Sequence, residues 1–166
     1  MKKAVFLDRD GVINDNRKPV NSPEDLKLYP WSAESILQLN NAGYYVFVVT
    51  NQGGIEMGYF KEKDLKEIHM KLINEIKKSG ANIDGIEYCP HFKTKCNCRK
   101  PLPGMLKRLA KKYDVDLKNS FMIGDRNVDI EAGNKSHCKT IKIGKPYSKA
   151  DYNVKNLLEA VKIILS

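Results

Sequence analysis

The chain has 166 residues, of which 42% are hydrophobic and 30% are charged, and its net charge is +9. This length suits one domain with a substantial core, so we expect residues 1–166 to form a single domain. No apolar run approaches the ~20 residues that span a bilayer, and the apolar stretch near Met1 is too short for a signal peptide. We therefore expect a cytoplasmic protein that binds no membrane.

Short apolar runs rich in β-branched and aromatic residues alternate with segments of helical periodicity. In chain order, the predicted elements are a strand at 4–7, a helix at 32–42, a strand at 45–49, a helix at 62–79, a strand at 86–88, a helix at 104–113, a strand at 121–123, a helix at 127–134, a strand at 140–143 and a helix at 153–165. This alternation predicts a doubly wound α/β fold, a three-layer Rossmann-like sandwich with a mostly parallel central sheet.

Sheets of this kind bind ligands beyond the carboxyl ends of their strands. We therefore expect functional residues directly after strands, and the longest irregular segments are the candidate binding surface. These segments lie at about 11–31, 50–60 and 89–103.

Two acids, Asp8 and Asp10, directly follow the first predicted strand. Paired carboxylates can hold Mg²⁺, which prefers oxygen ligands and usually takes one or two carboxylates together with substrate phosphate. An aspartate beside the metal can attack phosphorus, and a second carboxyl group can protonate the leaving alkoxide and later activate water. A calcium EF-hand loop is excluded, because Val12 and Ile13 stand where that loop needs a ligand and a glycine. A surface acidic turn remains the alternative for these residues alone.

Two further loops carry groups that suit phosphate chemistry. The second predicted strand runs into Thr50, Asn51 and Gln52, followed by two glycines. Hydroxyl, amide and bare backbone N–H groups in such a loop can cradle phosphate oxygens. The third loop supplies Arg99 and Lys100, two cations that can neutralise a transferring phosphoryl group.

A third acid, Asp125, follows the fourth predicted strand, and Asp129 lies one helical turn further on. At the carboxyl edge of the sheet, Asp125 would complete the magnesium site. Asp129 supports the metal ligands or, alternatively, is a surface acid of its helix.

Three cysteines and one histidine cluster within ten residues, as Cys89, His91, Cys96 and Cys98. Three thiolates and one imidazole suit tetrahedral Zn²⁺, and four protein ligands leave no position for water. We therefore expect a structural zinc site that fastens the loop before Arg99. Reduced free cysteines with a chance histidine are the alternative. The remaining cysteine and the two other histidines show no ligand spacing and are interpreted as structural.

The motifs DRDGV, TNQ, RKP and GDRNVD occur in this order and resemble the four motifs of the haloacid dehalogenase superfamily over nearly the whole chain. The longer segments FLDRDGVIN, VVTNQGGI, CPHFKTKCNCRKPLPGM and MIGDRNVDI are similar to the D-glycero-D-manno-heptose 1,7-bisphosphate phosphatases and the related histidinol-phosphate phosphatases. The resemblance implies the haloacid dehalogenase fold and a Mg²⁺-dependent phosphatase that works through an aspartyl-phosphate.

Carried over by motif, the resemblance also implies individual roles. Asp8 is the nucleophile and a metal ligand, and Asp10 is the general acid/base with its backbone carbonyl on the metal. Thr50 and Lys100 hold the phosphoryl group, and Arg99 contributes to substrate binding.

The fourth motif carries the remaining implied roles. The resemblance makes Asp125 the third protein ligand to Mg²⁺ and places Arg126 among the substrate-binding residues. Many heptose enzymes have a lysine where this chain has Arg126, and the GDR run is similar to the histidinol-phosphate branch.

Large caps in this superfamily are inserted after the first motif or between the second and third, and this chain holds a helix-strand unit at each place. We therefore expect a capless, open site whose specificity comes from the loops at 14–19, 53–60 and 89–98. In the first loop, Asn16, Arg17 and Lys18 are predicted to bind substrate, and its two cations could meet a remote second phosphate. Solvated surface cations are the alternative.

The segments GGI and PLPGM resemble the heptose branch more than the histidinol branch. The predicted reaction is therefore removal of the 7-phosphate of D-glycero-D-manno-heptose 1,7-bisphosphate, with histidinol phosphate as the alternative substrate. The alternative of another class is a zinc-stabilised basic module that binds nucleic acid or phosphate. It would need interleaved basic and aromatic residues, which the chain scarcely offers. We expect a small phosphorylated sugar as partner, no nucleic acid and a monomer.

Overall fold

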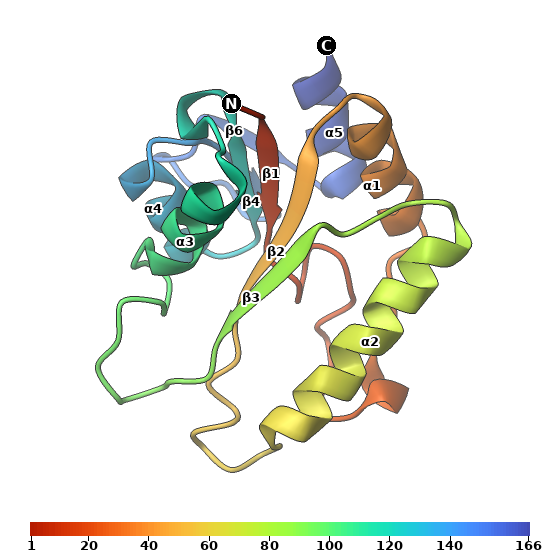
Figure 1. Cartoon of the computed structure of the whole chain (residues 1–166), viewed down its shortest axis with the longest axis vertical. Coiled ribbons are helices and arrows are strands. Elements are labelled where there is room, and N and C mark those ends of the chain that lie inside the picture. Colours follow the sequence, from red (N-terminus) through yellow and green to blue (C-terminus); the bar gives the residue numbers. More distant parts are fainter.

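A six-stranded sheet forms the centre of the computed structural model, which describes residues 1–166 (Figure 1). Its strands are β1 (Ala4–Leu7), β2 (Tyr45–Asn51), β3 (Gly85–Cys89), β4 (Phe121–Gly124), β5 (Lys139–Ile143) and β6 (Tyr152–Val154). All neighbouring strands run parallel, in the spatial order β3-β2-β1-β4-β5-β6. The chain order therefore reverses between β1 and β4, which is where doubly wound sheets place their ligands.

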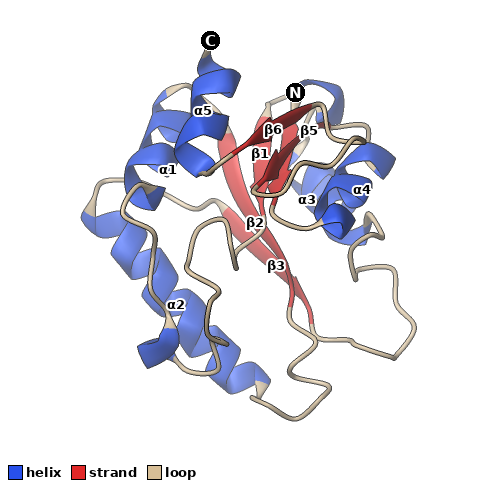
Figure 2. Ribbon diagram, turned by 180° about the vertical axis from the view of Figure 1, so that it is seen from behind, coloured by secondary structure: helices blue, strands red, loops and turns tan.

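Helices cover both faces of this sheet (Figures 1 and 2). The longer helices are α1 (Ser32–Asn41), α2 (Glu62–Lys78), α3 (Gly104–Tyr113), α4 (Asn127–Lys135) and α5 (Leu157–Leu165), and two short 3₁₀ turns lie at Pro23–Asp25 and Leu117–Asn119. One core joins β-strand residues to α1, α2 and α5, and a second core joins them to α3 and α4. These three layers confirm the predicted α/β sandwich. No helix has the combination of length and apolar sequence that a membrane crossing requires.

Strand β1, near the centre of the sheet, explains why the strands appear in the sequence as continuous apolar runs. All four residues of β1 are fully buried, because helices cover the sheet on both sides. Val5 and Leu7 belong to one core, whereas Ala4 and Phe6 belong to the other. Successive side chains of a strand point to opposite faces, so a doubly covered strand must be apolar at every position.

The predicted elements are found except at the end of the chain, where the prediction was wrong in two respects. The helix expected at 153–165 begins only at Leu157, and the residues before it form β6, which pairs with β5. Asn156 stops the helix from extending backward, because its extended backbone places its side chain to accept from the N–H of Glu159. Tyr152 and Asn153 are exposed, so this short edge strand lacks the apolar signal by which strands are recognised.

Candidate active site

Strands β1 and β4 bring two predicted metal ligands to the same edge of the sheet. Leu7 pairs with Ile123, and the backbone N–H of Asp8 donates to the carbonyl oxygen of Ile123 at 3.0 Å. Asp125 directly follows β4. Because neighbouring parallel strands end at one edge, both acids lie at the reversal point of the sheet.

A buried lysine joins two of the carboxylates beyond this edge. Lys100 is 3% exposed, and its Nζ lies 3.0 Å from Asp8 Oδ1 and 2.6 Å from Asp129 Oδ1. The same Nζ donates to the carbonyl oxygen of Val49 at 2.7 Å. An ammonium has three donors, so all of them have an acceptor here. Asp129 is 1% exposed and is therefore no surface acid of its helix.

The acids of β1, β4 and α4 form a group that fits a divalent cation. One carboxylate oxygen from each of Asp8, Asp125 and Asp129 lies within 4.8 Å of the others. Burial and the charge of Asp129 raise the pKa of Asp8 well above its usual range, and the same two causes raise the pKa of Asp125. Asp125 Oδ1 is buried without a hydrogen-bond partner. Clustered carboxylates with an unpartnered oxygen fit Mg²⁺, which would relieve their repulsion.

Two glycines permit this close packing. Gly11 has a φ of +83°, and a Cβ built on it would lie 2.1 Å from Asp125 Oδ2. A Cβ on Gly124 would lie 2.1 Å from the Cβ of Asp129. Both glycines therefore serve the close approach of the acids, and Gly11 also permits the left-handed backbone conformation of its turn.

Asp10 is held by a different set of groups. Its Oδ1 accepts from Arg9 Nε and Nη2 at 3.2 and 2.8 Å and from Asn14 Nδ2 at 3.0 Å, and its Oδ2 accepts from Gln52 Nε2 at 3.2 Å. Burial acts to raise the pKa of Asp10, but the charge of Arg9 and the hydrogen bonds from Asn14, Arg9 and Gln52 outweigh it and lower this pKa. The side-chain oxygens of Asp10 are not part of the acidic group around Asp125.

The last two residues of β2, Thr50 and Asn51, and Gln52 directly after them hold Asp10 and Lys100 in place. Gln52 Nε2 also donates to Thr50 Oγ1 at 2.8 Å, which ties the buried Thr50 to the loop that contacts Asp10. Asn51 Oδ1 accepts from the backbone N–H of Lys100 at 3.0 Å, and Asn51 Nδ2 donates to the Lys100 carbonyl at 3.1 Å. The peptide bond from Lys100 to Pro101 is cis. The TNQ motif therefore sets the backbone from which Lys100 reaches Asp8.

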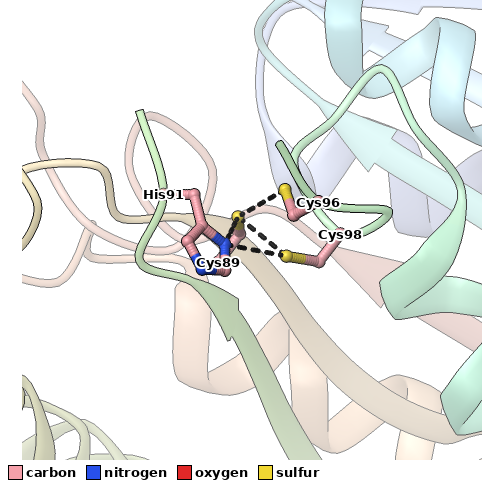
Figure 3. A group of neighbouring side chains, drawn as sticks. All are labelled: Cys89, His91, Cys96 and Cys98. Atoms are coloured by element: carbon pink, nitrogen blue, oxygen red, sulfur yellow. Dashed lines mark hydrogen bonds between the residues drawn. The ribbon is translucent and has the colours of Figure 1, made fainter. Parts of the chain in front are cut away.

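The cysteine and histidine side chains converge at the end of β3 (Figure 3). Cys89 Sγ lies 3.6 Å from Cys96 Sγ and 2.9 Å from Cys98 Sγ. His91 Nδ1 lies 3.5 Å from the Sγ atoms of both Cys89 and Cys98. Ligand atoms at the usual distances from a tetrahedral zinc are roughly 3.5–3.8 Å apart. Three of the four separations match this spacing, so the group fits Zn²⁺, with Cys89 and Cys98 slightly closer than a bound ion requires.

The zinc loop (89–98) leads directly to the cations of the site. The backbone N–H of Arg99 donates to Cys96 Sγ at 3.4 Å, and Arg99 Nη1 donates to the carbonyl oxygen of His91 at 2.9 Å. The Arg99 guanidinium lies 5.3 Å from the ring centre of Phe92. The cysteine cluster therefore positions Arg99, the residue directly before Lys100.

A cavity of about 980 Å³ opens over the acids. Among its lining residues are eight of the predicted site residues, namely Asp8, Asp10, Asn51, Gln52, Arg99, Lys100, Asp125 and Arg126. Lys142 and Lys145 also line it, and sequence reasoning missed both. Lys142 lies near the carboxyl end of β5 and Lys145 follows the strand, so the rule that ligands bind at this edge of the sheet would have pointed to both.

The loop after the nucleophile contributes less to this cavity than the sequence suggested. Asn16 Nδ2 donates to Asp125 Oδ2 at 3.2 Å, so it touches the acidic group. Arg17 and Lys18 are exposed and do not line the cavity, and Arg17 pairs with Asp15 at 2.6 Å instead. Buried Thr50 does not line it either.

The parallel sheet, the acids after β1 and β4 and the lysine between them define a phosphatase of the haloacid dehalogenase-like hydrolases. Comparison with known proteins agrees with this class. Residues 97–158 match the HAD-hydrolase-like family model.

Curated relatives are similar over most of the chain. The chain is 45% identical to the D-glycero-beta-D-manno-heptose-1,7-bisphosphate 7-phosphatase of Rhodopseudomonas palustris, over 79% of the chain and 77% of the relative. It is 35% identical to the D-glycero-alpha-D-manno-heptose-1,7-bisphosphate 7-phosphatase of Photorhabdus laumondii, over 98% of the chain and 96% of the relative. The chain belongs to the D-glycero-D-manno-heptose-1,7-bisphosphate 7-phosphatase family.

A solved structure of the same kind is also similar. The D,D-heptose 1,7-bisphosphate phosphatase from B. bronchiseptica, complexed with magnesium and phosphate, superposes with a TM-score of 0.90 at 32% identity. The match covers 98% of each chain. The resemblance in the motifs is thereby confirmed for the family and for the phosphatase class.

Proposed function

We propose that this protein removes the 7-phosphate of D-glycero-D-manno-heptose 1,7-bisphosphate with Asp8 as the nucleophile. The single observation that carries the mechanism is the placement of Asp8, buried at the carboxyl edge of β1, 3.0 Å from Lys100 Nζ and facing the cavity. A carboxylate held beside a cation at a sheet edge is arranged to attack a phosphoryl group that the cation helps to neutralise.

In the first step an Asp8 carboxylate oxygen forms a bond to phosphorus while the bond from phosphorus to the C7 oxygen breaks. The groups around Asp10 lower its pKa in the free site, so Asp10 takes up the catalytic proton when the negatively charged phosphoryl group binds beside it. It then gives this proton to the departing oxygen, and the sugar leaves as an alcohol. In the second step Asp10, now ionised, takes a proton from water as the water oxygen attacks phosphorus. The bond to Asp8 breaks, inorganic phosphate leaves and Asp10 is protonated again.

The other residues bind and orient the phosphoryl group. Lys100 neutralises its charge. Thr50 is buried and does not line the cavity, so it acts through Gln52, whose Nε2 donates to both Thr50 Oγ1 and Asp10 Oδ2. Asp8, the Asp10 backbone carbonyl and Asp125 would hold Mg²⁺, which when bound supplies charge stabilisation for the transferring phosphoryl oxygens. Asp129 would hold Lys100 in place rather than ligate the metal, because both of its oxygens are engaged: Oδ1 lies 2.6 Å from Lys100 Nζ, and Oδ2 accepts from the backbone N–H of Arg126 at 3.0 Å.

We propose that Zn²⁺ at Cys89, His91, Cys96 and Cys98 is structural. The cluster touches the backbone of Arg99 and lies outside the acidic group, so its part is to hold the loop that carries the two cations. Residues 1–166 then act as one catalytic domain, with no cap inserted over the cavity.

Three features support a sugar bisphosphate as the substrate. Relatives with both anomers in their names cover most of this chain. The cavity has room for a substrate larger than a phosphate ion, and it is lined by cations beyond Lys100, namely Arg99, Arg126, Lys142 and Lys145. Such cations suit a second phosphate remote from the one that reacts, and they replace the exposed Arg17 and Lys18 as its expected partners. Arg126 lines the cavity, which supports its proposed part in substrate binding.

The test is a phosphate-release panel with Mg²⁺ on the α and β anomers of heptose 1,7-bisphosphate and on histidinol phosphate. We expect turnover of at least one heptose anomer to exceed that of histidinol phosphate by a large factor, and phosphorus NMR to show loss of the C7 phosphate alone. A preference for histidinol phosphate would refute the substrate, and loss of the anomeric phosphate would refute the position of attack. The cytoplasmic location, the monomeric state and the lack of a nucleic-acid partner stay predictions.

A further inference from the structure

We propose that His69, on the middle of α2, is a positioning residue for the reaction: it holds Arg9, and Arg9 holds the carboxylate of Asp10. This inference rests on the proposed function, in which Asp10 is the general acid and base. His69 lies about sixty positions from Asp10 in the sequence, in a helix that otherwise packs on the sheet. Its spacing to other residues gave no reason to connect it with the site.

Arg9 is the buried link of this arrangement. Its side chain is 1% exposed, although it stands between the two acids of the first motif. Nε and Nη2 both donate to Asp10 Oδ1, and Nη1 lies 3.1 Å from His69 Nε2. A guanidinium carries five N–H donors in its plane and no acceptor, so each edge of a buried guanidinium needs an acceptor of its own. His69 supplies the acceptor on the side away from Asp10.

The imidazole is suited to this part because it is neutral. Burial and then the charge of Arg9 lower the pKa of His69 to about 3, while the charge of Asp10 opposes this change. The other titratable ring near it is Tyr88, whose ring centre lies 6.4 Å away. A neutral imidazole with its proton on Nδ1 accepts at Nε2, whereas an imidazolium has no acceptor and would repel the guanidinium.

As a consequence, the two carboxylate oxygens of Asp10 have different hydrogen-bond partners and different roles. Arg9 and Asn14 both donate to Oδ1, whereas Oδ2 accepts only from Gln52. Oδ2 is therefore the oxygen left to carry the catalytic proton. Without His69, Arg9 Nη1 would have a buried donor without an acceptor, and the guanidinium would turn to satisfy it. Asp10 would then lose the orientation that aims Oδ2 at the leaving group, and small misplacements of this kind cost large factors in rate.

The experiment compares two leaving groups in matched variants. The leaving group of heptose 1,7-bisphosphate is a sugar alkoxide, which needs a proton from Asp10. The leaving group of p-nitrophenyl phosphate is the stable p-nitrophenolate, which does not. We measure kcat/KM for both substrates, because this constant reports the step in which the leaving group departs. Asp10→Asn is the reference and should lose far more activity on the sugar phosphate than on the aryl phosphate.

His69→Met fills the same space with hardly any acceptor, whereas His69→Gln offers an amide oxygen to Arg9. We expect His69→Met to lower kcat/KM for the sugar phosphate about tenfold more than for the aryl phosphate, and His69→Gln to recover most of this loss. Leu72→Ala, a fully buried change on the same helix, should lower stability and leave the ratio between substrates unchanged.

The outcomes separate this inference from the proposed function. If His69→Met lowers kcat/KM equally for both substrates, His69 is only structural and the inference is overturned. The same conclusion follows if His69→Gln loses as much kcat/KM for the sugar phosphate as His69→Met does. A wild-type protein that does not hydrolyse the sugar phosphate, or an Asp10→Asn variant without leaving-group dependence, would instead refute the roles on which the inference rests.

Discussion

Replacing Lys100 with methionine should destabilise the protein strongly, because Lys100 is the only cation in contact with Asp8 and Asp129 inside the site. Its Nζ is 3.0 Å from Asp8 and 2.6 Å from Asp129, and all three side chains are nearly or fully buried. Burial favours the neutral amine, but the charges of Asp129 and Asp8 outweigh it and raise the pKa of Lys100, so the ammonium is present at neutral pH.

Removing one partner of a buried ion pair typically costs about 3–5 kcal/mol, since the remaining charge loses its compensation. A domain of 150–250 residues loses roughly 2–4 °C in Tm for each kcal/mol. Lys100→Met should therefore lower Tm by roughly 6–20 °C at pH 7 without added Mg²⁺, as measured by calorimetry. It should also abolish phosphate release, because in the proposed mechanism the charge of the same ammonium neutralises the phosphoryl group.

Lys142→Met is the matched control. Lys142 is equally buried, at 3% exposed, but its Nζ donates only to the carbonyl oxygens of Ile143 and Lys145. Its loss leaves neutral acceptors unpaired, which costs about 1–3 kcal/mol. If Lys100→Met were no more destabilising than Lys142→Met, the carboxylates around Lys100 would not depend on its charge and the reasoning would fail.

Two further predictions concern the loops that carry the cations. Zinc analysis should find about one zinc per chain. Cys96→Ser should lose the zinc together with most of the phosphatase activity, whereas the control Cys138→Ser should keep both. A zinc-free protein with full activity would refute the structural-zinc proposal. Glu56 accepts from the backbone N–H groups of Phe92, Lys93 and Thr94, and hydrogen bonds from Thr94 and then Lys93 lower its pKa from 4.5 to about 2. Between these pH values the unfolded chain binds more protons, so the stability that Glu56 contributes is complete above pH 4.5 and is lost as the pH falls toward about 2. The Tm advantage of the wild type over Glu56→Gln should therefore be constant above pH 5 and shrink below it, and a difference independent of pH would show that the loop contact carries no charge-dependent stability.

The fold was predictable from the sequence because the central strands β1, β2 and β4 are buried on both faces and read as apolar runs. The same logic located Asp8, Asp10 and Asp125, since the carboxyl ends of parallel strands share one edge. It failed at β6, where exposed side chains remove the apolar signal.

Contacts between distant segments could not be derived in the same way. The sequence does not say that Asp129 turns inward to Lys100, because a helix has polar residues on both sides of the boundary between its buried and exposed faces. Nor does it say that Arg9 turns away from the cavity toward His69, since an arginine in an acidic motif reads as a substrate ligand or a surface charge. Arg17 is the opposite case: its closeness to the nucleophile in sequence suggested substrate binding, but it pairs with Asp15 outside the cavity.

The central claim is that Asp8 accepts the phosphoryl group. Its most direct test is acid quenching of the protein within the first turnovers of heptose 1,7-bisphosphate and Mg²⁺, followed by mass spectrometry of the peptide that contains residues 4–12. We expect one phosphoryl group on Asp8 in the wild type, and neither adduct nor phosphate release in Asp8→Asn. Turnover at near-native rates by Asp8→Asn, or a phosphoryl group on another residue, would contradict the account.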